Sequence, residues 1–136
     1  MIPPTDLRIN NVVVYDKACH RVSGIIPPRE PEGAYWIKFA DSTRPRHIND
    51  LVPIELTGEW FMRLGFHVGT IGFIRRTGFR IKGEGYYLGF TANGGGVGYQ
   101  FANPHFEYHI FYVHQLQNLF YSLTGRELEL TQKLTQ

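Results

Sequence analysis

The fold of this chain is decided most clearly by the stretch Tyr108-His-Ile-Phe-Tyr-Val-His-Gln-Leu-Gln-Asn-Leu-Phe-Tyr-Ser-Leu-Thr-Gly125. An aromatic, β-rich run passes there into a helix. Four apolar residues recur at i, i+3, i+4 and i+7, so that one helix face must be buried; they are Leu116, Leu119, Phe120 and Leu123. Gly125 stands where a left-handed cap would end the helix. The polar residues that fall largely on the other side are Gln115, Gln117, Asn118 and Ser122. The stretch predicts a terminal helix packed against a sheet.

The composition is that of a folding chain. The 136 residues are 43% hydrophobic and 19% charged, which fits one compact unit with a packed interior. The formal charge of +2 excludes the global basic surface of many nucleic-acid binders, so any anion site must be local. Cys19 is the only cysteine, which favours a reducing compartment, and we expect a cytoplasmic protein with no leader and no membrane span.

The first part of the chain, residues 1–54, reads as a small β-barrel. Short β-rich runs at residues 11–15, 21–26 and 34–39 alternate with turn residues such as Asp16 and Lys17. The proline-rich run 27–33 cannot form a ladder strand and reads as an exposed hairpin loop. Strands of this length and spacing predict a strongly curved antiparallel barrel of the Src-homology-3-like type.

The second part, residues 55–136, reads as a short helix, an antiparallel sheet and the terminal helix, forming one compact unit with the first part. Thr57 is the expected N-cap, and Gly65 ends a helix of about two turns. Strands joined by glycine-containing turns are expected after it, at residues 66–69, 70–75, 79–82, 86–90, 98–101 and 105–111. The fold class is therefore expected to be α+β.

Three blocks carry a resemblance to a known family. They are Asp6-Leu-Arg-Ile-Asn-Asn11, Pro53-Ile-Glu-Leu-Thr-Gly-Glu-Trp60 with the following Gly65-Phe66, and the block from Val113 to Gly125. With them the chain resembles a family of small uncharacterised proteins of Bacteroidetes genomes, their phages and mobile elements. The family tends to have glycine at the position of Asn10, and asparagine also tolerates a left-handed backbone. The resemblance implies an order of elements and a mobile-element context, and it supplies no catalytic residues.

Neither a metal site nor a nucleophile is indicated. On a strand, His105 and His109 share a face but lie roughly 13 Å apart, and no carboxylate or thiol stands at ligand spacing beside them or His114. Cys19 and His20 point to opposite faces of a strand, so Cys19 is expected to be a small core residue. We expect no enzyme, no cofactor and no metal, although a site assembled from distant residues stays open.

A glycine-rich run offers two alternatives. Gly94, Gly95 and Gly96 resemble a phosphate loop, but the dinucleotide fingerprint fails at Tyr99 and no helix follows. The run is either a flexible hairpin tip or a mobile loop whose backbone amides close over a ligand.

The feature that favours a function is the basic stretch Ile74-Arg-Arg-Thr-Gly-Phe-Arg-Ile-Lys82. Arginine forks bind phosphate and aromatic faces stack bases, although the same residues would also serve a solvated hairpin over an aromatic core. The expected ligand-binding residues are Arg75, Arg76, Arg80, Tyr86, Tyr99, Gly94, Gly95 and Gly96.

The leading hypothesis is a non-enzymatic protein, encoded by a phage or mobile element, that binds or sequesters a nucleotide or a nucleotide-derived signalling ligand. A single-stranded nucleic acid would suit the same residues. The alternative is a structural or protein-interaction module that assembles, as a homo-oligomer for example, through its sheet or its terminal helix.

Overall fold

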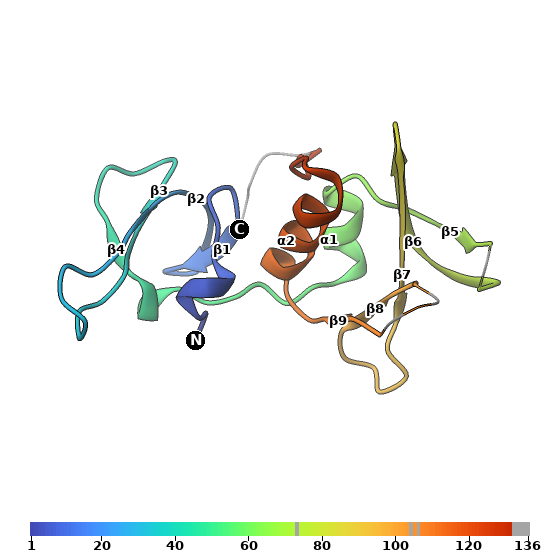
Figure 1. Cartoon of the computed structure of the whole chain (residues 1–136), viewed down its shortest axis with the longest axis horizontal. Coiled ribbons are helices and arrows are strands. Elements are labelled where there is room, and N and C mark those ends of the chain that lie inside the picture. The colour runs from blue at the N-terminus through green and yellow to red at the C-terminus, as the bar shows by residue number, and fades with distance from the viewer. Residues whose placement is uncertain (73, 104, 106, 132–136) are drawn as a thin grey trace.

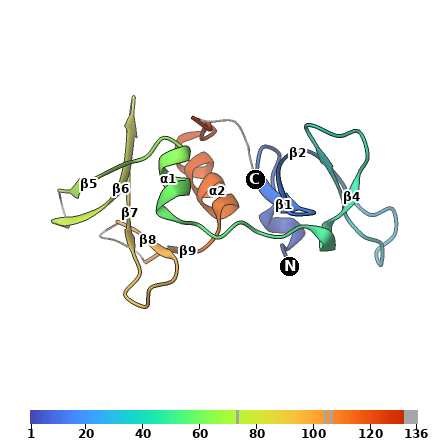
Figure 2. The ribbon, with the colours of Figure 1, turned by 180° about the vertical axis from the view of Figure 1, so that it is seen from behind.

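The computed structural model describes residues 1–72, 74–103, 105 and 107–131. Within these residues the chain is an α+β protein with two antiparallel sheets (Figure 1). Two α-helices, α1 (Gly58–Arg63) and α2 (Val113–Thr124), lie between the sheets, as the view from behind also shows (Figure 2). No helix in the described part of the chain is long and apolar enough to cross a membrane.

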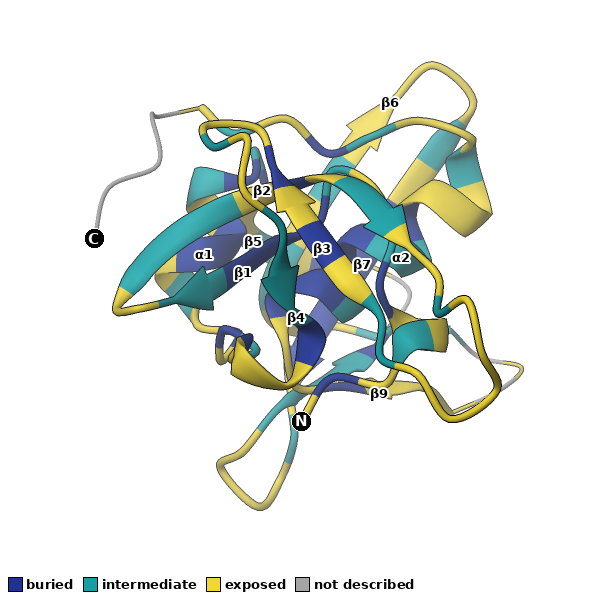
Figure 3. Cartoon of the chain, turned by 90° about the vertical axis from the view of Figure 1, so that its left-hand side faces the viewer, coloured by how far each residue is buried: buried dark blue, intermediate teal, exposed yellow. Residues whose placement is uncertain are grey.

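The first sheet has the order β1-β2-β3-β4, with β1 (Val12–Tyr15), β2 (Ala18–Ile26), β3 (Trp36–Phe39) and β4 (Arg46–His47). Asp16 and Lys17 form the first turn with positive φ angles of 50° and 67°, which match the right-handed twist of a two-residue hairpin. A register shift between Val22 and Gly24 bends β2. The sheet therefore curves into a half-barrel. Exposed and buried residues alternate along β3 (Figure 3).

The half-barrel and the short 3₁₀ helices η1 (Pro4–Asp6) and η2 (Ile48–Asp50) enclose a hydrophobic core of their own. Its buried members are Ile2, Leu7, Val13, Val22, Ile37, Phe39, Ile48 and Leu51. All of them lie before residue 52, so this core is built without the second sheet.

The second sheet is a meander of β5 (His67–Ile71), β6 (Arg76–Gly83), β7 (Tyr86–Ala92), β8 (Tyr99–Phe101) and β9 (His109–Ile110) in sequential order. The two strands expected at residues 66–69 and 70–75 are one strand, β5, which ends at Ile71. Arg75 follows in a turn with φ of 55°. The strand expected at 105–111 is reduced to two residues in β9, and residues 104 and 106 lie outside the described part.

An aromatic cluster joins α1 to this sheet. Phe61 is fully buried, stacks on Phe79 at 4.6 Å between ring centroids, and meets Phe66 and Phe90 at 5.1 and 5.6 Å. Thr57 caps α1 as expected, because its Oγ1 accepts the backbone N–H of Trp60 at 3.4 Å. The two-turn helix therefore gains its stability from packing on the sheet.

The buried face of α2 differs from the face expected from its sequence. Leu116 and Phe120 are buried, but Leu119 is half-buried and Leu123 is 50% exposed. Gln117, expected on the polar side, is 3% exposed. The molecule has two lobes, one built on the first sheet and one built on the second, and α2 contacts both. The buried surface of α2 therefore extends toward the first sheet and includes the Gln117 amide. The expected left-handed cap at Gly125 is confirmed, with φ of 73°.

The amide of Gln117 joins α2 to the start of β1. Its Oε1 accepts the backbone N–H of Val12 at 2.9 Å, and its Nε2 donates to the carbonyl of Asn10 at 3.0 Å. The next residue, Asn118, accepts from the Asn11 side chain at 2.8 Å. Asn10 has a φ of 79°, so the left-handed conformation expected to be tolerated at that position is present. The block at residues 6–11 therefore contacts the block at 113–125 directly.

An ion pair extends the same contact. The guanidinium of Arg8 donates from Nη1 and Nη2 to the two carboxylate oxygens of Glu127 at 2.6 and 2.7 Å, a bidentate geometry. Hydrogen bonding from Arg8 lowers the pKa of the Glu127 carboxyl below its usual value. Asn10 adds a further hydrogen bond to Glu127 at 2.8 Å.

Candidate functional site

The candidate site is a cleft on the face of the second sheet that points away from the aromatic core. Along β6 the side chains alternate, so Phe79 and Ile81 pack toward the core while Arg80 and Lys82 project outward. Arg80 is paired with His67 on β5, and Lys82 with Tyr87 on β7. The cleft, of about 210 Å³, is lined by His67, Arg80, Lys82 and Tyr87.

Arg80 is held in place by β5. Its Nη1 donates to the carbonyl of Thr70 at 3.0 Å. A Cβ on Gly69 would come within 2.7 Å of the Arg80 Nε, so the guanidinium lies directly over a residue that must be small. This hydrogen bond uses one of the five N–H groups of the guanidinium, so among the described residues other N–H groups stay available to an anion. The cleft therefore has a positioned cation, Arg80, beside a second cation, Lys82.

The two tyrosines expected to stack a ligand lie elsewhere. Tyr86 is paired with Gly83 and turns to the inner side of the sheet, where its ring meets Phe120 edge-on at 5.3 Å. Tyr99 packs edge-on against Phe61 at 4.8 Å, within the aromatic core. Neither ring faces the cleft. The aromatic residue beside the cations is Tyr87, with 43% of its surface exposed.

The register of the β6–β7 hairpin could have identified Tyr87. Glu84 and Gly85 form a two-residue turn, which fixes Gly83 opposite Tyr86 and Lys82 opposite Tyr87. Facing residues lie on the same side of a sheet, so Tyr87 shares the face of Lys82 and Arg80. His67 carried no comparable signal, since its position depends on the β5–β6 register.

The remaining arginines of the expected site are separated from Arg80. Arg75 lies in the β5–β6 turn and Arg76 begins β6, and both side chains are exposed. Arg76 stands four residues before Arg80, roughly 13 Å along an extended strand. The basic stretch therefore supplies two separate groups of cations, one at the tip of the hairpin and one in the cleft.

The glycine loop also lies away from the cleft. Gly94, Gly95 and Gly96 form the β7–β8 turn beyond Ala92, five residues along β7 from Tyr87 and so roughly 16 Å away. Asn93 closes the turn, because its backbone N–H donates to the Gly98 carbonyl at 3.1 Å and its Nδ2 to the Val97 carbonyl at 2.9 Å. The His109 ring hydrogen-bonds the Asn93 Oδ1 at 2.8 Å, which ties the loop to β9.

The histidines do not converge. In the described ranges no three His, Cys, Asp or Glu side chains are placed to hold a metal ion. His114 is 2% exposed in α2, stacked on Tyr112 at 5.8 Å, and its Nδ1 has no hydrogen-bond partner in the part of the chain that the structure describes. Burial lowers the pKa of His114 below its ordinary value, and the negative charge of Asp6 only partly opposes this.

The protonation of His114 should make stability depend on pH. The unfolded chain takes up the proton near pH 6.5 and the folded chain only at lower pH, so the free energy of unfolding should fall as the pH drops below 6.5. We expect a contribution to the slope of up to about 1.4 kcal/mol per pH unit. Urea unfolding between pH 5 and 8 measures it, and His114→Phe, which retains an aromatic ring beside Tyr112, should flatten the curve. An unchanged slope in the variant would contradict this origin.

Cys19 is half-buried on β2 and packs against the hydrophobic core that includes Phe61 and Leu116. Desolvation raises the pKa of its thiol, which makes the thiolate scarcer at neutral pH. The neighbouring His20 ring stacks on Phe39 at 4.6 Å and contacts the Asp41 carboxylate at 3.1 Å. Cys19 and His20 therefore engage different partners.

Comparison of the chain with protein-family models, with curated proteins and with solved structures gave no match.

Proposed function

We propose that this protein is a non-enzymatic binding protein for a nucleotide or a nucleotide-derived signalling ligand. The observation that carries the proposal is the cleft in which Arg80, Lys82, His67 and Tyr87 converge. Two cations supply the charge for a phosphate group, and an exposed aromatic ring supplies a face for a base.

The geometry suggests how the ligand parts would be divided. The guanidinium of Arg80, fixed on Gly69 and Thr70, would bind two phosphate oxygens with its remaining N–H groups, and Lys82 would add a second positive charge. The base would stack on Tyr87. A volume of about 210 Å³ suits the phosphate and sugar, with the base lying across the exposed ring. Arg75 and Arg76 would add positive potential from the hairpin tip.

The cellular setting belongs to the same proposal. The resemblance to proteins of Bacteroidetes phages and mobile elements supports a role in sequestering the ligand on behalf of such an element. The single cysteine favours the reducing cytoplasm as its location. We also propose that the first sheet is a barrel of the Src-homology-3-like type, supported by its short strands and its half-barrel curvature.

The test is calorimetric titration of the full chain with cyclic dinucleotides, mononucleotides and short oligonucleotides. Lys82→Ala and Tyr87→Ala should each weaken binding at least tenfold, because each removes a contact to the ligand while both side chains are exposed and contribute little to stability. The matched control is Lys38→Ala on β3, an exposed lysine of the other sheet, which should bind as the unaltered protein does.

A second salt concentration separates the ligand classes. Affinity for a strand of nucleic acid should fall steeply with salt, whereas affinity for a small nucleotide should fall less. Equal losses for Lys82→Ala and Lys38→Ala would overturn the cleft as the site. No heat and no thermal shift with any of these ligands would overturn the proposal as a whole.

A second function is favoured by an exposed apolar region along the β8–β9 edge. Val97, Tyr108 and Phe111 are 61%, 44% and 39% exposed there, and Phe111 lies against Gly98, where a Cβ would come within 2.4 Å of its ring. Such a region suits a protein-interaction module that assembles with another copy of itself. This function would be favoured over ligand binding if light scattering showed a stable oligomer and the calorimetric titrations with nucleotides and oligonucleotides gave no heat.

A further inference from the structure

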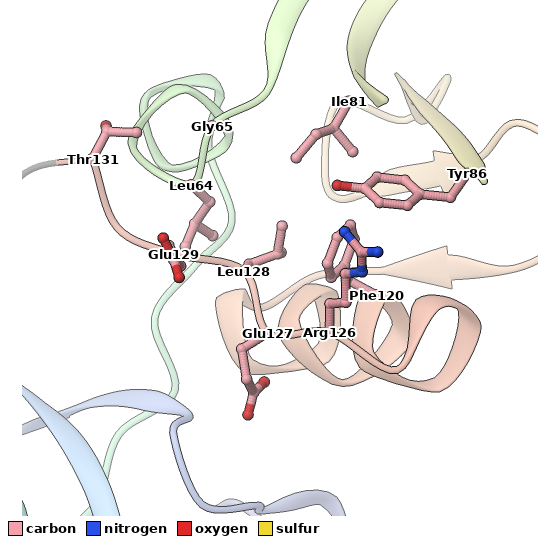
Figure 4. Close-up of a pocket in the computed structure, with 10 residues that line it drawn as sticks. All are labelled: Leu64, Gly65, Ile81, Tyr86, Phe120, Arg126, Glu127, Leu128, Glu129 and Thr131. Atoms are coloured by element: carbon pink, nitrogen blue, oxygen red, sulfur yellow. The ribbon is translucent and has the colours of Figure 1, made fainter. Parts of the chain in front are cut away.

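A second pocket lies on the inner side of the same sheet, separate from the proposed nucleotide cleft. Its volume is about 530 Å³ (Figure 4). The C-terminal segment 126–131 closes one wall, since it runs from the end of α2 to α1, where the Thr131 N–H donates to the Arg63 carbonyl at 2.8 Å. The opposite wall is the β6–β7 hairpin.

The floor of this pocket is apolar. It is formed by Leu64 from the end of α1, Ile81 from β6, Phe120 from α2 and Leu128 from the C-terminal segment. Leu64, Phe120 and Leu128 are at most 8% exposed. The floor can therefore bury the hydrocarbon part of a ligand, which favours binding because apolar surface is removed from water.

Two hydrogen-bond donors meet at one end of the pocket. The Tyr86 ring lies over Gly83, where a Cβ would come within 2.4 Å of it, and its hydroxyl is directed toward the pocket (Figure 4). The guanidinium of Arg126 lies 5.9 Å from the centroid of the same ring. Arg126 has no carboxylate partner among the described residues, so its charge is available to an anion.

The two acidic residues of the pocket do not cancel this charge. Glu127 is turned away from the pocket and holds Arg8 in a bidentate ion pair. Glu129 is exposed and lies at the other end of the pocket, beside Thr131 and Leu64 (Figure 4). The pocket therefore combines an apolar floor with one cationic, hydrogen-bonding end.

We propose that this pocket binds an amphiphilic monoanion: a small ligand with an aliphatic or aromatic body and one carboxylate. The body lies on Phe120, Leu128 and Ile81, and the carboxylate accepts hydrogen bonds from the Arg126 guanidinium and the Tyr86 hydroxyl. A charge-assisted pair of this kind fixes the orientation of the ligand, while the buried body supplies most of the affinity.

Decanoate is the probe, used below the concentration at which it forms micelles, and decyltrimethylammonium is its cationic match. Calorimetric titration of the full chain should give binding of decanoate at least tenfold tighter than binding of the cation. Arg126→Gln should weaken decanoate binding at least tenfold, and Arg126→Lys should restore part of it. Arg44→Gln, an exposed arginine of the other lobe, should leave it unchanged.

A last variant tests whether the pocket prefers an anionic ligand. Glu129→Gln should leave decanoate binding unchanged or strengthen it, because Glu129 opposes an anion. Weaker decanoate binding in Glu129→Gln, equal affinity for the two probes, no loss in Arg126→Gln, or no binding of decanoate at all would each overturn the proposal. Far-UV circular dichroism of each variant without ligand shows whether its fold is intact, and Arg126→Lys serves as the test if Arg126→Gln does not fold.

Discussion

Replacing Phe61 with alanine should lower the free energy of unfolding by about 3 to 5 kcal/mol. The ring is fully buried and contacts four other aromatic rings, from Phe66, Phe79, Phe90 and Tyr99. Those partners belong to β6, β7, β8 and the segment after α1, so they cannot all move into the space that the ring leaves. The cavity that remains adds to the lost transfer free energy. Urea denaturation at pH 7 measures the change.

The matched control lies on the next residue of the same helix. Met62 is 47% exposed, and Met62→Ala should change stability by no more than about 0.5 kcal/mol, because alanine is at least as good a helix former and little apolar surface is lost. A shift in the Met62→Ala midpoint as large as that of Phe61→Ala would mean that α1 does not pack as described.

The parts of the fold that the sequence predicted depend on local chemistry. Thr57 accepts the N–H of Trp60, Gly125 adopts the left-handed cap and the α+β pattern of strands and helices is present. Asn10 adopts a positive φ of 79°, a conformation that asparagine tolerates better than most residues. Each of these features is set by residues within a few positions of one another, so a single sequence is enough to identify them.

The surfaces of α2 could not be predicted in the same way. The spacing of Leu116, Leu119, Phe120 and Leu123 indicates one apolar face, yet Leu123 is exposed and Gln117 is buried. The spacing of apolar residues identifies an apolar stripe on a helix. It does not reveal how many other structural elements pack against that helix. Here a second neighbour, the start of β1, covers the flank that carries Gln117 and satisfies its amide with backbone groups.

The residues expected to bind a ligand do not lie together, for a related reason. Arg80 lies in the cleft, whereas Tyr86 and Tyr99 lie on the opposite face and the glycine loop lies beyond the other end of β7. Arginines and tyrosines that are close in the sequence need not share a face of the sheet, because successive residues of a strand point to opposite faces. Only the pairing register decides which tyrosine meets which cation, and a one-residue change exchanges Tyr86 for Tyr87.

The other large effect is expected at the contact between the two lobes. Gln117→Ala should lower the free energy of unfolding by about 2 to 4 kcal/mol, because it removes the partners of the Val12 N–H and the Asn10 carbonyl. Val12 is fully buried, so water does not readily replace the amide. Urea denaturation measures the loss, and hydrogen exchange should show faster exchange of the Val12 amide in the variant than in the unaltered protein.

Ser122 provides the matched control, since it lies in the same helix but is exposed and makes no side-chain hydrogen bond among the described residues. Ser122→Ala leaves no buried group without a partner, so the cost should stay at or below about 0.5 kcal/mol. Equal costs for the two substitutions would show that burial does not set the difference. A Gln117→Ala variant within about 0.5 kcal/mol of the unaltered protein would show that the amide does not join the lobes, and that the contact depends instead on Arg8 and Glu127.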